Sequence, residues 1–317
     1  MKQITLICVV LTCSLTRAEL PQFDKGSRPK DFNELKKYYA SRGLHITHKK
    51  IKTPVDVRQT NDLVYSQRHG LPLHIDTFIP EKVNTTQTVV ILVHGGGWKK
   101  GNRSGEHTKA AWFSSRGYIA VCPEYRLSGV ATFPAAIHDL KDAIRWTRSH
   151  ASQWGANPDN IVLMGFSAGA HLVALAATAG PEAGLDLPDS QSRSSSVAAC
   201  IAVAGPSITN DERALRDARK PGSNYQLFFG GLPETIPDVY EQASPSHWVS
   251  GNEPPMLFIT EGNPEAHKII RSRLDKMGIR NEGFNLTGGL HSEWNWEPWF
   301  TPTMEVTEKF IRSVASP

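Results

Sequence analysis

The stretch that decides the fold spans residues 160–177 and reads NIVLMGFSAGAHLVALAA. Its first apolar run, residues 161–164, has the length of a β-strand, and residues 168–177 carry apolar side chains at helical spacing. The pentapeptide GFSAG at 165–169 lies between them and fits the pattern G-x-S-x-G. Glycines flank the serine because a strand-to-helix turn this sharp leaves no room for side chains there. The pattern predicts a nucleophile elbow with the Ser167 hydroxyl exposed at its tip.

Other apolar runs of strand length lie on both sides of this motif. We expect strands over residues 62–65, 73–79, 88–93, 118–122, 197–204, 256–260 and 282–286. Segments with helical spacing separate most of them, over residues 107–116, 134–152, 267–277 and 303–314. This alternation predicts an α/β fold with a mostly parallel sheet covered by helices on both faces, and an antiparallel edge made by the first two strands.

The first 18 residues have the character of a secretory signal. Lys2 gives a positive start, residues 4–15 form an apolar stretch too short to span a bilayer comfortably, and small residues precede a cleavage position after Ala18. We therefore expect an exported protein, secreted or periplasmic, with no stable insertion in a membrane. An uncleaved membrane anchor is the alternative interpretation.

Size and composition suit one large catalytic unit. The chain has 317 residues and a formal net charge of +4, and no run of basic residues suggests a nucleic-acid partner. We expect an N-terminal extension over residues 19–60 and a catalytic domain over residues 61–317, with a lid-like insertion over residues 205–255. Cys122 and Cys200 each lie in an apolar run, so we expect buried free thiols.

A glycine run follows the strand expected at residues 88–93. It reads HGGGW at residues 94–98, and residues without side chains let the backbone bend its N–H groups toward a substrate. We expect these groups and the N–H of Ala168 to form an oxyanion hole. A nucleotide cofactor is not expected, because the chain has neither a Gly-Lys-Ser/Thr loop nor a G-x-G-x-x-G motif. No Cys/His cluster has metal-ligand spacing, so we expect no metal.

A serine hydroxyl becomes a nucleophile when a base takes its proton and a third group fixes the tautomer of that base. His291 follows the last expected strand in the sequence GGLH, which makes it the favoured base. His267 begins an expected helix and His247 lies in the insertion, and both remain alternatives.

The acid should follow the serine and precede the histidine in a fold of this order. The loop after the strand at 256–260 reads EGNPE and offers Glu261 and Glu265. Glu265 is favoured, Glu261 stays open, and Asp238 is a more distant alternative.

Several stretches together resemble α/β-hydrolases of the carboxylesterase kind, in the branch shared by hormone-sensitive-lipase-like enzymes and feruloyl or acetyl-xylan esterase-like enzymes. The matching stretches are HGGGW at 94–98, EYRL at 124–127, FPAAIHDLKDAIRW at 133–146, GFSAG at 165–169 and ASPSHWV at 243–249, followed by PPMLFITEG and GGLH.

The resemblance implies a sheet of about eight strands with a small lid, and hydrolysis of carboxylic esters through an acyl-enzyme. It implies Ser167 as the nucleophile and His291 as the base. It also implies oxyanion donors at Gly96, Gly97 and Ala168.

The chain departs from the family pattern at the acid. An aspartate is usual three residues after the glycine that is Gly262 here, whereas this chain has Glu265. The resemblance therefore supports Glu265 by position, with a longer side chain than the family usually has there.

Tryptophans lie close to the expected catalytic residues. Trp98 ends the glycine run, and Trp294 and Trp296 follow His291. Such rings form a platform for a sugar or aryl ring, or they anchor the core. The insertion at 205–255 carries mixed charges, unlike the strongly apolar lid of a long-chain lipase. We predict an ester of a short acyl group with a carbohydrate or phenolic carrier.

Two other functions remain open from the sequence. A peptidase or amidase of the same fold would use the same triad. A binding protein that has lost catalysis would not need the serine, the histidine and the HGGGW run, all of which are intact.

Overall fold

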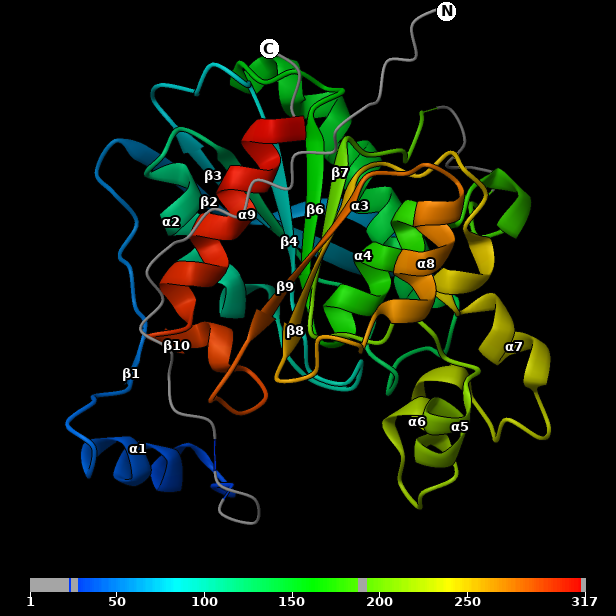
Figure 1. Ribbon diagram of the computed structural model, residues 1–317. Helices are drawn as coiled ribbons and strands as arrows, with labels where there is room; N and C mark the ends of the chain where they lie inside the picture. Colours follow the sequence, from blue (N-terminus) through cyan, green and yellow to red (C-terminus); the bar gives the residue numbers. More distant parts are fainter. Residues whose placement is uncertain (1–22, 24–27, 188–192, 315–317) are drawn as a thin grey trace, which may run out of the picture.

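The computed structural model describes residue 23, residues 28–187 and residues 193–314 (Figure 1). The expected signal segment and its cleavage position at Ala18, together with Cys8 and Cys13, lie outside the described residues. Within those ranges, no helix has the length and apolar character needed to cross a bilayer.

An eight-stranded sheet forms the centre of the molecule, in the order β2-β3-β5-β4-β6-β7-β8-β9 (Figure 1). Its strands are β2 Val57–Arg68, β3 Leu71–Pro80, β4 Val89–Val93, β5 Ile119–Pro123, β6 Ile161–Phe166, β7 Ala199–Val203, β8 Met256–Glu261 and β9 Asn281–Leu286. The pairs β2–β3 and β3–β5 are antiparallel, and all pairs from β5 to β9 are parallel. The mostly parallel sheet with an antiparallel edge is thus confirmed, and β2 begins before the boundary expected at residue 61.

The central strands are apolar throughout because both of their faces are covered. All residues of β4 and β6 are buried, which is typical of parallel strands between two helical layers. Their register pairs Val93 with Gly165, so both strands end at the same level of the sheet. This alignment brings the glycine run after β4 next to the serine turn after β6.

Helices cover both faces of this sheet (Figure 1). The helices α3 Ala135–Ala151, α4 Ala168–Thr178 and α8 Lys268–Lys276 pack on one face. The helices α2 His107–Ser114 and α9 Phe300–Val314 pack on the other. Each layer buries its apolar stripe against one side of the strands, so the core is divided in two by the sheet.

Three short α-helices lie between β7 and β8, in the segment predicted to be a lid. They are α5 Glu212–Ala218, α6 Asn224–Phe229 and α7 Pro237–Gln242. Asn224 at the start of α6 lies against Gly97, because a Cβ on that glycine would be 2.3 Å from its Nδ2. The insertion therefore reaches over the edge at which β4 and β6 end.

The N-terminal extension packs on the end of the chain that follows His291. Its helix α1 spans Phe32–Ala40, and its strand β1 (Thr47–His48) pairs antiparallel with β10 (Trp296–Glu297). Asp31 starts α1 by accepting hydrogen bonds from the backbone N–H groups of Asn33 and Glu34.

Cys122 in β5 and Cys200 in β7 are both buried and free. The strands β4 and β6 separate them in the sheet. The expectation of two buried thiols is confirmed.

Candidate active site

Ser167 occupies the turn between β6 and α4 with φ 52° and ψ −117°, a conformation that residues other than glycine rarely adopt. The turn is closed on both sides. A Cβ on Gly165 would be 2.2 Å from the Gly169 carbonyl oxygen, and one on Gly169 would be 2.2 Å from that of Val93. The two glycines are therefore required by space, and the strained turn holds the serine hydroxyl out from the end of the sheet.

His291 lies on the loop after β9 and contacts the serine. Its Nε2 is 2.9 Å from Ser167 Oγ, and its Nδ1 is 2.7 Å from Glu261 Oε2. A carboxylate at Nδ1 keeps the proton on that nitrogen and leaves Nε2 free to accept the serine proton. The hydrogen bond with Glu261 raises the pKa of His291, against burial, which lowers it.

The carboxylate beside His291 belongs to Glu261, the last residue of β8. Its Oε1 also accepts the Ser292 N–H at 2.9 Å, so one carboxylate holds both the imidazole and the backbone next to it. Only 15% of the Glu261 side chain is exposed, which strengthens both interactions by excluding water.

The prediction of Glu265 as the acid is wrong in this structure. Its side chain is 63% exposed and forms an ion pair at 2.9 Å with Nζ of Lys268, three residues later in the chain. β8 continues through Glu261, so the last residue of the strand places its carboxylate beside His291. Glu265 lies beyond a turn at Gly262.

The other candidates from the sequence are engaged elsewhere. His267 is buried with its Nδ1 2.9 Å from Ser207 Oγ, and His247 pairs with Glu241 at 3.1 Å. Asp238 lies in the first turn of α7.

The glycine run provides backbone donors next to the serine. Gly96 has φ 122° and Gly97 has φ 61°, and a Cβ on Gly96 would be 1.9 Å from the Lys100 carbonyl oxygen. Within the described residues, the N–H groups of Gly96, Gly97 and Ala168 donate to no other protein group. Ala168 also begins α4, where the helix dipole adds positive potential. These three groups are available to bind a developing oxyanion.

Residues just after β5 contact the start of the glycine run and the segment that follows the run. Tyr125 donates its hydroxyl proton to the His94 carbonyl oxygen at 3.0 Å and stacks on the His94 ring at 4.4 Å. Glu124, the residue before it, accepts a hydrogen bond from Arg103 in the segment after the run at 2.5 Å.

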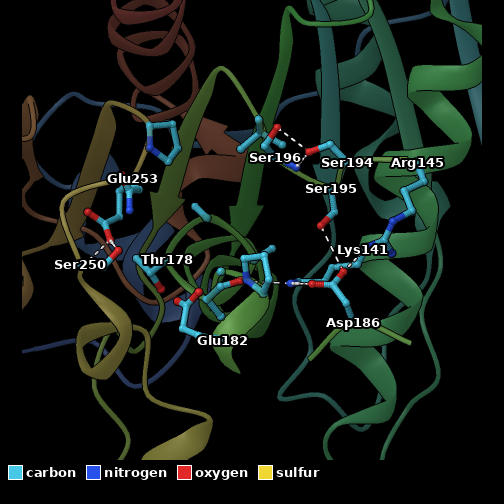
Figure 2. Close-up of a pocket in the computed structure, with 18 of the residues that line it drawn as sticks. Lys141, Arg145, Thr178, Glu182, Asp186, Ser194, Ser195, Ser196, Ser250 and Glu253 are labelled. Atoms are coloured by element: carbon cyan, nitrogen blue, oxygen red, sulfur yellow. Dashed lines mark hydrogen bonds and ion pairs between the residues drawn. The ribbon is translucent and has the colours of Figure 1, made fainter. Parts of the chain in front are cut away.

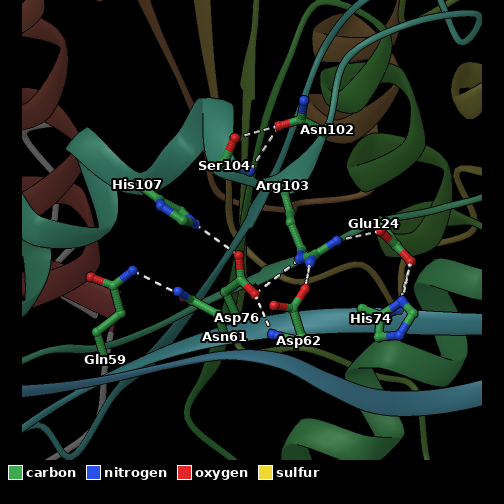
Figure 3. Close-up of polar contacts among 10 residues, drawn as sticks. All are labelled: Gln59, Asn61, Asp62, His74, Asp76, Asn102, Arg103, Ser104, His107 and Glu124. Atoms are coloured by element: carbon green, nitrogen blue, oxygen red, sulfur yellow. Dashed lines mark hydrogen bonds and ion pairs between the residues drawn. The ribbon is translucent and has the colours of Figure 1, made fainter.

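Arg103 is the centre of a polar cluster that Figure 3 shows. It contacts Asp62, Asp76 at 2.9 Å and Glu124, three carboxylates from β2, β3 and the end of β5. His107 Nε2 binds the second oxygen of Asp76 at 2.8 Å. One arginine thus ties the segment after the glycine run to the antiparallel edge of the sheet. Sequence reasoning missed it, because its three partners are far apart along the chain.

We expect Arg103→Met to lower kcat by about tenfold with little change in KM, because a displaced glycine run loses transition-state hydrogen bonds rather than ground-state contacts. Steady-state kinetics on a nitrophenyl ester measures both constants. Arg116→Met is the matched control, since Arg116 lies at the end of α2 and contacts Trp112 and Glu308. A normal kcat for Arg103→Met would show that the cluster does not set the position of the run.

The structure does not form the tryptophan platform that the sequence suggested, because Trp98 and Trp294 are buried and the half-buried Trp296 packs against the N-terminal extension. Trp98 is 4% exposed and stacks on Phe228 at 4.7 Å. Trp294 is 3% exposed and packs beneath His291, edge to face at 5.2 Å. Trp296 stacks on Phe32 of α1 at 4.6 Å, with Lys36 of the same helix over its ring. The rings therefore have structural roles. Trp98 packs in the core, Trp294 supports the loop that carries His291, and Trp296 holds the N-terminal extension.

A cavity of about 280 Å³ opens beside His291 and Glu261. Apolar residues such as Pro206 and Ile208 line part of it, and polar or charged side chains of the insertion and of the segment after β8 line the rest. The polar and charged residues are Ser207, Asp211, Arg213, Asp217, Asn263 and His267. Within the described part of the chain, Asp211 caps α5 and Asp217 pairs with Lys220, whereas Arg213 has no hydrogen bond or ion pair.

A second, larger hollow of about 530 Å³ lies between the end of α4 and the segment before β7 (Figure 2). Two of its cations share one carboxylate, since Lys141 Nζ binds Asp186 at 2.7 Å and Arg145 binds the same carboxylate. Ser195 is 3.3 Å from Asp186, and none of the histidines lines this hollow. We assign no chemistry to it.

Comparisons with known proteins place this chain among esterases in sequence and in fold. The family model described as BD-FAE matches residues 75–270. A probable carboxylic ester hydrolase, LipM of Mycobacterium tuberculosis, is 30% identical over 69% of this chain and 51% of its own length. The chain spans about half the length of the curated relatives it matches.

Solved structures share the fold. A thermophilic esterase of Thermogutta terrifontis superposes with a TM-score of 0.67 at 22% identity, over 82% of this chain and 93% of its own. A truncated carbohydrate esterase from gut microbiota gives a TM-score of 0.68 at 21% identity, over 83% of this chain and 100% of its own. At this level of identity the likeness establishes the fold alone.

Proposed function

Because the chain belongs to the BD-FAE family, we propose that it hydrolyses carboxylic esters with Ser167 as nucleophile, His291 as base and Glu261 as acid. The observation that carries this proposal is the pair of contacts of His291, 2.9 Å to Ser167 Oγ and 2.7 Å to Glu261 Oε2. The name of the mycobacterial relative, a probable carboxylic ester hydrolase, supports it.

The reaction follows from these contacts. His291 takes the Ser167 proton as Oγ attacks the ester carbonyl carbon, and the carbonyl oxygen becomes an oxyanion held by the N–H groups of Gly96, Gly97 and Ala168. The intermediate collapses with loss of the alcohol, which receives the proton from His291, and an acyl-serine remains. Water then attacks the acyl carbon with His291 as base again, and the carboxylic acid leaves. Glu261 stabilises the imidazolium in both halves without taking its proton.

We further propose that the acyl group is short and the alcohol is polar. Aromatic side chains of α6 fill the space behind the glycine run, since Phe228 and Tyr225 lie 4.7 Å and 5.4 Å from the Trp98 ring. A long acyl chain has no apolar channel among these packed rings. The cavity beside His291 has charged and polar side chains in its lining together with apolar ones, and the polar groups suit a hydroxylated carrier such as a sugar.

An ester panel tests this preference. We expect kcat/KM for acetyl and propionyl nitrophenyl esters to exceed that for the lauroyl ester by roughly tenfold or more, because the packed rings exclude the longer chain. Acetylated sugars and a nitroanilide of the same acid complete the panel. Faster turnover of the lauroyl ester would contradict the short-acyl proposal, and faster turnover of the anilide would make the protein an amidase.

A further inference from the structure

Glu293 lies two residues after His291 and is 1% exposed. Both of its carboxyl oxygens lack a hydrogen-bond partner among the described residues. Buried carboxyl groups are rarely left without a partner, because desolvation strongly disfavours the charge. The Glu293 carboxyl is not part of the triad, so its position next to the loop that carries His291 needs a separate explanation.

The carboxyl fills the inner side of the turn that carries His291. A Cβ on Gly289 would be 1.4 Å from Glu293 Oε2, so this glycine leaves the space that the carboxyl occupies. The Glu293 N–H donates to the Leu290 carbonyl oxygen at 2.9 Å and closes the turn. The position of His291 therefore depends on a turn packed around one carboxyl group.

The N-terminal extension closes the same region from the other side. Tyr39 of α1 donates its hydroxyl proton to the Gly288 carbonyl oxygen at 2.5 Å. The Lys49 N–H donates to the Asn295 carbonyl oxygen at 2.8 Å, next to the pairing of β1 with β10. Residues 288–297 are thus held between α1 and the sheet, with the Glu293 side chain enclosed.

The charged groups around Glu293 favour its protonated form. Burial and the nearby Glu261 carboxylate raise the pKa of Glu293 to about 9, and Arg28 opposes this only weakly. Tyr39, whose own pKa is raised to about 12 mainly by burial, stays uncharged beside it. At neutral pH Glu293 therefore adds no second negative charge beside Glu261, which contacts His291.

We propose that Glu293 is a positioning residue, whose enclosed carboxyl supports the turn at residues 289–293 so that His291 lies between Glu261 and Ser167. This rests on the proposed function. Ionisation of Glu293 places a second negative charge beside Glu261 and disfavours the packed turn. Turnover should then fall as the pH rises past about 9.

The test compares Glu293→Gln and Glu293→Ala with the full-length protein over a range of pH on nitrophenyl acetate. Titration with a fluorophosphonate normalises each rate to the number of active sites. Glutamine keeps the shape and cannot ionise, so we expect kcat within about twofold of the unchanged protein at neutral pH and no alkaline fall. Alanine removes the carboxyl that supports the turn. We expect kcat to fall by about tenfold with KM within about twofold, because a misplaced His291 slows the chemical step rather than binding. Glu305→Ala, at an exposed position of α9, is the matched control.

Two results would overturn the proposal: an alkaline fall that persists in Glu293→Gln, or an unchanged kcat for Glu293→Ala. If the alanine variant fails to fold, the pH profile of the glutamine variant decides alone. These failures are distinct from failure of the triad, which would appear as absence of fluorophosphonate labelling in the unchanged protein.

Discussion

Ser167→Ala is expected to lower kcat for short esters by about 10⁵- to 10⁶-fold, because loss of the nucleophile removes the covalent route as a whole. A residual rate above that of buffer should remain, since the N–H groups of Gly96, Gly97 and Ala168 still bind the oxyanion when water attacks directly. Nitrophenyl acetate hydrolysis at high enzyme concentration measures both the decrease in kcat and the residual rate.

The control for this substitution is Ser194→Ala, an exposed serine at the rim of the larger hollow. It should leave kcat unchanged. Unaltered circular dichroism of Ser167→Ala would show that the loss is chemical, because alanine keeps the Cβ and so leaves the strain of the positive φ at this position unchanged. Full activity in Ser167→Ala would refute the mechanism.

Glu261→Gln is expected to lower kcat by about 10³- to 10⁴-fold, the range that loss of the triad carboxylate gives when the histidine tautomer is no longer fixed. Glu265→Gln should stay within about twofold of the unchanged protein, because Glu265 contacts Lys268 and not His291. The pair of variants is well matched, since both replace a glutamate by its neutral isostere, one at the end of β8 and one in the turn that follows. The reverse outcome would restore Glu265 as the acid.

The pH profile gives a second readout of the same pair. The base acts in its neutral form, and the hydrogen bond with Glu261 raises the pKa of His291. Activity should therefore fall on the acid side at a higher pH than an ordinary histidine would give. Glu261→Gln removes the cause of the raised pKa, so the acid limb of its residual kcat/KM should move to lower pH. Glu265→Gln should leave the limb in place.

The nucleophile turn could be predicted from the sequence because its causes are local. Contacts within the turn and with the neighbouring strand leave no room for a Cβ at Gly165 or Gly169. The flanking apolar runs predict a strand and a helix. His291 could be placed for a similar reason, since it follows the last strand of the sheet directly.

The acid could not be fixed from the sequence because two glutamates stand four residues apart at the end of one strand. The choice depends on where β8 stops, and strand ends are among the least certain features of a sequence-based prediction. The structure continues β8 through Glu261, and Lys268 at i+3 attracts Glu265 instead. The lysine was a usable signal, since ion pairs at this spacing are common on helices.

The tryptophans and Glu293 were misread or missed because their partners are distant in the chain. Trp98 is covered by Phe228 of the insertion, and Trp296 by Phe32 of the N-terminal extension. Neither contact follows from local spacing. Likewise, the enclosure of Glu293 depends on α1, which packs on residues separated from it by most of the chain.

The most direct test of the account is to find the atom that a fluorophosphonate modifies. After reaction with the unchanged protein, peptide mass spectrometry should show one adduct, on Ser167 in the turn between β6 and α4. The rate of labelling should fall in Glu261→Gln and stay unchanged in Glu265→Gln. An adduct on a different residue, or no adduct in protein that hydrolyses esters, would contradict the central claim that Ser167, His291 and Glu261 act together.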